Sequence, residues 1–592
     1  MKTDFAGPGV RRAFTYGADE APPLPDGYSL EGDGIYYEEE ENKKVFVCSR
    51  IDILAQTRDD HGGNWGRLIH VHRADGTTCR YAIPMSQIES GEHRKILVSL
   101  GVRLGRGKVQ LDELLARGAE GQFALCTARI GWKGPERFVF PGETIGPAGV
   151  EEAVFQSAEV AEHNFIASGE LKEWQLAVAA QCAGNKILTF VLGAALAAPL
   201  LEPTRSLNVV LNLTGESSSG KSTAADVAAS VYGPGGAGGY GQSWRATDNG
   251  LEGLAEAHND CLTILDELGQ ADPDKIGECA YMLANGIGKQ RANTDGSPRR
   301  PRHWQGLYLS TAEVSLSGRM TDGFKSRSPR AGQAVRFIDI PSDGGAGLGV
   351  FQRTNGYDPE ELGNKTAGAM FANSLAEASA TYYGTAAPAF VQRVIQEREA
   401  IKNRWPEFEQ EFLGRAVPKS ADKQVGRVGG SFALIAFGGV LACEFGILPF
   451  SEDDVIDAVI FCFEAWLRER GTSGSLEKQQ YVQKLQDFLE RHGDSRFSPS
   501  DSDGEAADHI SVRDRAGWKR GDNHLITTAA WSKEIFAGMN TKAAAKYLVE
   551  IGVLRPSNGK STTPIHVSIK AGGEGRTIRL YVVTPELWRT ST

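Results

Sequence analysis

Residues 207–223, LNVVLNLTGESSSGKST, have the types and the spacing of a phosphate-binding loop, the Walker A motif. An apolar strand precedes Gly215, and a helix-forming segment follows Lys221. Gly215 and Gly220 allow the backbone to curl so that successive N–H groups point at a phosphate, and the start of the helix adds its positive end. We therefore expect the nucleotide to be held by Gly215, Glu216, Ser217, Ser218, Ser219, Gly220, Lys221, Ser222 and Thr223.

The chemistry of this loop implies ATP and Mg²⁺ as cofactors. The Lys221 ammonium would reach the β- and γ-phosphate oxygens, and the Ser222 hydroxyl would be a ligand of Mg²⁺. A second acidic motif follows about 45 residues later, where the apolar strand CLTIL ends in Asp266 and Glu267. Asp266 would hold the metal, and Glu267 would polarise the attacking water. An acidic pair after a strand is also a common helix N-cap, so the pairing with the Walker A loop is what favours catalysis.

A third strand, WQGLYLSTAE, ends in polar residues beside the expected Walker B strand. Ser310 and Thr311 are the candidates for sensing the γ-phosphate. The alternative is that both residues simply begin a turn.

A basic segment, residues 286–302, lies between the acidic motif and this third strand. It contains the hairpin-tip dipeptide Asp295-Gly296 and is rich in cations, in a chain whose net charge is −11. Its position is that of a pore loop that grips single-stranded phosphates, and the alternative is a solvated surface loop. The candidate nucleic-acid contacts are Lys289, Arg291, Arg299, Arg300 and Arg302.

Several arginines follow the third strand, in SLSGRMTDGFKSRSPRAGQAVRFIDIP. Arg319, Arg327 and Arg330 are candidates for an arginine finger that completes the nucleotide site of a neighbouring subunit. This arrangement requires a ring, and we expect a homo-oligomer, a hexamer. Arg427, in QVGRVGGSFALIAF, is a candidate lid arginine over the nucleotide.

The composition is that of an ordinary globular protein. The 592 residues are 41% hydrophobic and 23% charged, which excludes a wholly disordered chain. The eight cysteines form no CxxC or Cys/His motif, so zinc and disulfide frameworks are both disfavoured and a reduced, cytoplasmic protein is expected. The longest apolar run, 187–201, is shorter than a bilayer span and contains Pro199, which indicates a buried core helix and no membrane association.

These motifs need a multidomain α/β protein to position them. Alternation of strand, glycine loop and helix up to about residue 341 indicates a parallel sheet, short alternating strands before residue 140 indicate a β module, and the C-terminal end reads as a helix followed by a two-stranded wing. The expected parts are a flexible tail (1–25), a mostly β module (26–165), a P-loop ATPase core (166–350), a helical lid region (351–490) and a winged-helix-like end (510–592).

Several strings together resemble the bacterial domain-of-unknown-function family 927. These are WGRLIHVHRADG, SGELKEWQLAVA, the Walker A loop, TDNGLEGLAEAHND, LTILDELGQ, LSTAE and AGQAVRFIDIP. The resemblance implies a P-loop ATPase of phages, plasmids and integrated elements, with primase-like or other replication proteins as partners. The order of its motifs is similar to that of superfamily 3 helicases within the AAA+ group. Those helicases often end the sensor strand in Asn, whereas this strand ends in Ser-Thr-Ala-Glu.

Two functional hypotheses follow. The first is an ATP-hydrolysing, ring-forming DNA helicase or translocase that replicates a mobile element. The second is a regulatory or anti-phage defence NTPase whose ring signals to a protein partner without unwinding DNA.

Overall fold

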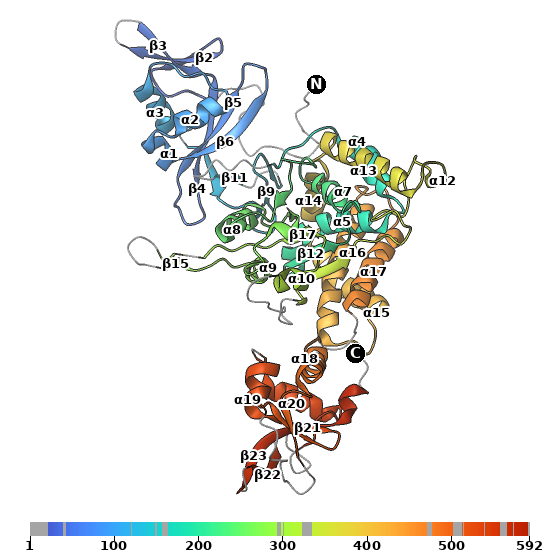
Figure 1. Ribbon diagram of the computed structural model, residues 1–592. Coiled ribbons are helices and arrows are strands. Elements are labelled where there is room, and N and C mark those ends of the chain that lie inside the picture. Colours follow the sequence, from blue (N-terminus) through green and yellow to red (C-terminus); the bar gives the residue numbers. More distant parts are fainter. Residues whose placement is uncertain are drawn as a thin grey trace. The chain divides into compact units, whose positions relative to one another are not determined.

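The computed structural model divides the chain into two compact units (Figure 1). The first comprises Met1–Pro418 and Gly426–Arg470, and the second comprises Lys419–Val425 and Gly471–Thr592. The residues that the structure describes are 22–39, 43–119, 121–147, 151–156, 164–292, 298–299, 301–322, 334–470, 476–500, 512, 514–537, 539–556, 565–571 and 574–589.

The N-terminal part of the first unit is built on a five-stranded sheet in the order β11-β7-β4-β5-β6. Its strands alternate buried and more exposed positions, and the antiparallel β4, β5 and β6 form its larger half. Isoleucine and valine side chains of this sheet pack against helices α1 to α3. The bounds are β4 Ile51–Arg58, β5 Gly66–His72, β6 Thr78–Pro84, β7 Phe123–Thr127, β11 Ala153–Phe155, α1 Met85–Ser90, α2 His93–Ser99 and α3 Lys108–Arg117.

Two smaller sheets complete this part of the unit. Their strand orders are β1-β2-β3 and β10-β9-β8, and all neighbouring strands in both sheets pair antiparallel. The bounds are β1 Tyr28–Glu31, β2 Gly34–Glu39, β3 Lys43–Ser49, β8 Gly131–Trp132, β9 Phe138–Val139 and β10 Thr144–Ile145.

A parallel five-stranded sheet forms the core of the first unit, in the order β13-β14-β17-β12-β18. The three central strands β14, β17 and β12 are almost wholly buried, as expected for a parallel sheet covered by helices. Because β12, β14 and β17 are neighbours and parallel, their carboxyl ends meet at one edge. The bounds are β12 Val209–Thr214, β13 Gln242–Ser243, β14 Leu262–Asp266, β17 Leu307–Ala312, β18 Phe337–Pro341, α7 Lys221–Ala229, α8 Asp248–Ala257, α9 Ile276–Asn285 and α10 Leu316–Thr321.

Apolar helices pack around this sheet. The expected core helix is α5, Lys186–Ala197, which contacts α7 and α17. Two helical stretches, Lys186–Thr204 and Lys423–Glu444, are long and apolar enough to cross a membrane, but 89% and 78% of their most apolar windows are buried, as in core helices. The remaining bounds are α4 Leu171–Trp174, α6 Leu201–Thr204, α12 Pro359–Leu362, α13 Asn364–Thr381, α14 Ala386–Gln396, α15 Arg398–Ala416, α16 Lys423–Glu444 and α17 Glu452–Arg470.

The second unit has its own core, in which α18 and α20 pack against a sheet in the order β19-β20-β21-β23-β22. The antiparallel pair β22 and β23 follows α20, so the predicted order of a helix and then two strands is present. The bounds are α18 Leu476–His492, β19 Phe497–Pro499, β20 Gly517–Arg520, β21 Asn523–Thr527, α19 Thr528–Ala530, α20 Thr541–Glu550, β22 Ile565–Ala571 and β23 Glu574–Val583.

Candidate functional site

Residues 215–220 form a curled loop between the end of β12 and the start of α7. Ser218 and Gly220 both have left-handed backbones, with φ of +60° and +93°. Such residues turn successive N–H groups inward and create a concavity suited to an anion. A Cβ atom on Gly220 would lie 2.8 Å from Val350 Cγ2, so the loop requires glycine here for space as well as for conformation.

A second glycine-rich segment, 344–350, supports this loop, and sequence reasoning missed its role. The Val350 N–H donates to the Ser219 carbonyl at 2.8 Å. Gly349 has φ of +67°, and a Cβ on it would lie 2.2 Å from Ser219 O. The run GGAGLG after β18 was the available signal, since a backbone that approaches another backbone this closely needs glycine.

Lys221 points into the curl of the loop. Its Nζ donates to the Gly215 carbonyl at 2.9 Å and to the Glu216 carbonyl at 2.5 Å, and the residue is only 8% exposed. Burial lowers the pKa of this ammonium, and the negative charges of Glu313, Glu267 and Asp266 oppose that shift. The cation therefore lies where the loop would place a phosphate, with three carboxylates around it.

Asp266 ends β14, and Thr311 of the adjacent strand β17 holds it. Thr311 Oγ1 donates to Asp266 Oδ1 at 2.5 Å and accepts the Glu267 N–H at 3.0 Å. Glu267 has φ of +58°, an unfavourable backbone for a residue with a Cβ, and its carboxylate accepts the Gly269 N–H at 3.2 Å. The hydroxyl thus fixes both members of the acidic pair at the edge of the sheet.

The two candidate sensor residues lie on opposite faces of β17, because successive side chains of a strand alternate. Ser310 is fully buried, and its hydroxyl accepts the Trp244 Nε1–H at 2.8 Å. Thr311 faces the acidic pair. Thr311 therefore contacts the acidic pair, whereas Ser310 belongs to the packing of the sheet. Both residues lie inside β17, so the alternative that they begin a turn is wrong.

Glu313 is a site residue to which the sequence analysis gave no role. It follows the end of β17 and is exposed. Among the three carboxylates that raise the pKa of Lys221, Glu313 has the largest effect. The sequence feature that could have identified Glu313 is its position two residues after Thr311, at the same edge of the sheet.

The basic segment is tied to helix α8 by three ion pairs. Asp248, Glu252 and Glu256 are spaced four residues apart and so form one stripe along α8. Their partners are Lys289, Arg291 and Arg302, at 2.6, 2.6 and 3.2 Å in that order.

These pairs keep the base of the segment on α8. Glu252 is fully buried, and it also accepts the Lys289 backbone N–H at 3.0 Å. The hydrogen bond to Asp248 raises the pKa of Lys289, which remains a cation. The expected hairpin is present as the antiparallel pair β15, Arg291–Ala292, and β16, Pro298–Arg299, whereas Arg300 lies outside the described residues.

Of the candidate finger and lid arginines, the structure describes Arg319 and Arg427. Arg319 is on α10, where Nη2 donates to the Ala271 carbonyl at 2.6 Å and Nη1 lies 3.6 Å from Asp322, so its guanidinium is engaged within its own chain. Arg427 is exposed on α16. Arg327 and Arg330 lie outside the described residues.

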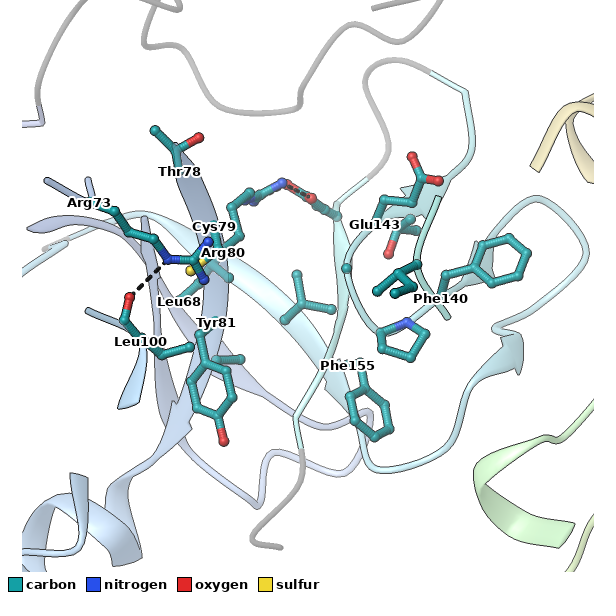
Figure 2. Close-up of a pocket in the computed structure, with 17 residues that line it drawn as sticks. Leu68, Arg73, Thr78, Cys79, Arg80, Tyr81, Leu100, Phe140, Glu143 and Phe155 are labelled. Atoms are coloured by element: carbon teal, nitrogen blue, oxygen red, sulfur yellow. Dashed lines mark hydrogen bonds and ion pairs between the residues drawn. The ribbon is translucent and has the colours of Figure 1, made fainter. Parts of the chain in front are cut away.

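The N-terminal module contains a separate cavity of about 490 Å³ (Figure 2). Arg80 lines it and forms a two-pronged ion pair with Glu152, with Nη1 and Nη2 at 2.6 and 3.0 Å from the carboxylate oxygens. Arg73, which donates to the Leu100 carbonyl at 2.9 Å, lies on the same wall, and Phe140 and Phe155 lie across from it.

Comparison with known proteins finds a family model and solved structures that are similar to this chain. Residues 28–303 match the model of a family described as "Domain of unknown function (DUF927)". No curated protein matches the chain.

Among solved structures, the chain is similar to one titled "SCCmec type IV Cch - active helicase", with a TM-score of 0.65, 17% identity and coverage of 95% of this chain and 98% of that chain. A structure titled "The A form apo structure of NrS-1 C terminal region-CTR" matches with a TM-score of 0.23 and 12% identity, with coverage of 62% of this chain and 80% of that one. The chain therefore shares the fold of the SCCmec protein over nearly its whole length.

Proposed function

We propose that this protein is an ATP-hydrolysing, ring-forming DNA helicase or translocase that serves the replication of a mobile genetic element. The observation that carries the proposal is that Asp266 and Glu267, both held by the Thr311 hydroxyl, act electrostatically on Lys221 in its curled loop. A solved protein of the same fold has a title that calls it an active helicase, which supports the assignment of the reaction class.

The residues present fit a nucleotide with its metal. Ser342 Oγ, beside Gly215, is buried and has no hydrogen-bond partner among the described residues, so a polar group is left for a ligand at the loop. Ser222 is exposed at the start of α7, and Asp266 keeps a carboxylate oxygen that Thr311 does not use. Hydroxyl and carboxylate oxygens are the ligands that Mg²⁺ prefers, and they would hold it here.

Each side chain then has a role in hydrolysis. The loop N–H groups and Lys221 bind and orient the phosphates, and the ammonium offsets charge that develops on the β- and γ-oxygens. Glu267 accepts the proton of the attacking water. Thr311 keeps the Glu267 backbone and the Asp266 carboxylate in position. Mg²⁺, when bound, adds positive charge against the same phosphate oxygens.

Ring assembly as a hexamer is part of the proposal, with Arg319, Arg327 or Arg330 reaching a neighbour's nucleotide. Arg319 can reach a neighbour only after its guanidinium leaves the Ala271 carbonyl and Asp322. Mixing Lys221→Ala protein with an Arg→Ala finger variant should restore part of the ATPase activity, because some interfaces then combine an intact site with an intact finger. A monomer in the presence of ATP, or no recovery for any of the three arginines, would exclude this arrangement.

A second candidate function is a regulatory or defence NTPase that signals to a protein partner. The three ion pairs on α8 favour it, because phosphates would have to compete with Asp248, Glu252 and Glu256 for the cations of the segment.

Unwinding of a forked DNA with ATP and Mg²⁺ separates the two functions. The helicase proposal predicts strand separation by the wild-type protein and none by Lys221→Ala. ATP hydrolysis without strand separation, on forks with either polarity of tail, would contradict the helicase function and favour the signalling function.

A further inference from the structure

The N-terminal module brings two histidines and an aspartate together on one face of its larger sheet. Asp52 of β4 lies directly opposite His70 of β5 in the antiparallel register. His70 and His72 are two residues apart on β5, so their rings lie on the same face as the Asp52 carboxylate. One ligand atom from each residue can be chosen so that all three atoms lie within 4.8 Å of one another.

The Asp52 carboxylate is held in a fixed orientation. Arg50 donates to it twice, from Nε to Oδ1 at 3.0 Å and from Nη2 to Oδ2 at 3.1 Å, and the carboxylate is largely buried. A carboxylate has about four lone-pair positions, so these two bonds leave capacity for a further cation. An outer partner that orients a ligating carboxylate is a usual feature of metal sites.

His72 lies beside one of the Asp52 oxygens. Its Nε2 lies 2.7 Å from Asp52 Oδ2, so the two atoms share a proton. The rings of His70 and His72 have centroids 4.7 Å apart. A metal ion between these groups would replace the shared proton, which would leave to solvent, because an imidazole ligates through a deprotonated nitrogen.

The charges around Asp52, His70 and His72 allow a metal cation to bind there. Arg80 of β6 lies opposite His70, and its charge is offset by the two-pronged pair with Glu152. Both histidines are partly exposed, which leaves a path for entry from solvent.

We propose that Asp52, His70 and His72 form a binding site for a divalent transition-metal ion of the class of Zn²⁺. Two imidazoles and one carboxylate suit this class, whereas Mg²⁺ and Ca²⁺ prefer sites made of oxygen ligands. Three protein ligands leave the fourth position of a tetrahedral ion open to water or to a ligand. The site lies in the N-terminal module and is separate from the nucleotide site of the core sheet.

Equilibrium dialysis of the full-length protein against Zn²⁺, with Mg²⁺ in excess and the metal content then measured, tests this proposal. We expect one bound Zn²⁺ in the wild type and in Asp266→Ala, and at least about a tenfold loss of affinity in His70→Ala and in His72→Ala. His61→Ala is the matched control, since this exposed histidine of the same module lies outside the cluster.

A second measurement does not depend on the folding of a variant. Co²⁺ added to the wild-type protein should give the visible absorption of a site with nitrogen ligands, and an equivalent of Zn²⁺ should remove it. The proposal is overturned if the wild type retains no Zn²⁺, or if His70→Ala and His72→Ala retain as much Zn²⁺ as His61→Ala.

Discussion

The Thr311 hydroxyl lies 2.5 Å from Asp266 Oδ1, across two neighbouring parallel strands of the core sheet. The same oxygen accepts the backbone N–H of Glu267 at 3.0 Å. A single side chain therefore sets the direction of the proposed metal ligand, Asp266, and the backbone of the proposed base, Glu267. Since Glu267 has an unfavourable left-handed backbone, this contact also stabilises a conformation that the residue would not adopt by itself.

Thr311→Val should lower ATP turnover about 10- to 100-fold, the usual effect of losing a group that orients a metal ligand, with little change in nucleotide affinity. Steady-state kinetics and a nucleotide-binding titration measure the two effects. Ser310→Ala is the matched control on the opposite face of the strand, because it removes only the acceptor of the Trp244 N–H. Equal losses of turnover in the two variants would contradict a role for Thr311 in the site.

Glu267→Gln should bind ATP and Mg²⁺ but hydrolyse ATP very slowly. The amide cannot take a proton from water, whereas Asp266 and Lys221 remain in place. A filter-binding assay should show retained nucleotide, and the variant should accumulate in its assembled, ATP-bound form. Normal turnover would move the proton-accepting role to another residue, and Glu313 would be the first to examine.

Replacing both Lys289 and Arg291 with glutamine should weaken binding to single-stranded DNA. If each cation contacts one phosphate, the slope of log affinity against log salt should fall by about 1.4. Basal ATP hydrolysis should survive. Replacement of two exposed lysines outside the segment, Lys172 and Lys365, controls for net charge. An unchanged slope would mean that the pairs with Asp248 and Glu252 hold these cations permanently, and it would favour the signalling function.

Asp260 gives a prediction about pH. Burial raises the pKa of this carboxyl to about 6, although the Trp132 N–H and Asn259 donate to it. The folded chain therefore binds this proton more tightly than the unfolded chain, so the contribution of Asp260 to the free energy of unfolding falls as the pH rises from about 4 to about 6.

Asp260→Asn removes this titration. The free energy of unfolding of the wild type, relative to that of the variant, should fall by up to about 3 kcal/mol between pH 4 and pH 7. Urea-unfolding curves across this range measure the difference, with the exposed Asp453→Asn as control. Parallel pH profiles for the wild type and Asp260→Asn would show that the buried carboxyl does not titrate in this way.

Local sequence patterns predicted the elements of the core because the physics that forms them is local. The strand before Gly215, the helix that begins at Lys221 and the strands that end at Asp266 and Ala312 follow from apolar runs and glycine positions. The apolar run 187–201 is buried, as its length and proline indicated.

These local patterns could not predict contacts between residues that are far apart in the chain. The partners of Lys289 and Arg291 lie about 40 residues away on α8, and no spacing rule connects a basic segment to an acidic stripe. The support of Ser219 by Gly349 and Val350 depends on how two loops meet after folding. The cluster of Asp52, His70 and His72 was missed for the same reason, since Asp52 joins the two histidines only through the register of β4 and β5.

The central claim is that nucleotide is bound and hydrolysed between Lys221 and the Thr311-anchored acidic pair. The most direct test is ATP hydrolysis by purified, folded wild-type protein and by Lys221→Ala, with Lys172→Ala as the matched control for loss of one lysine. We predict Mg²⁺-dependent turnover in the wild type and in Lys172→Ala, and none in Lys221→Ala. Wild-type turnover in Lys221→Ala would contradict the claim.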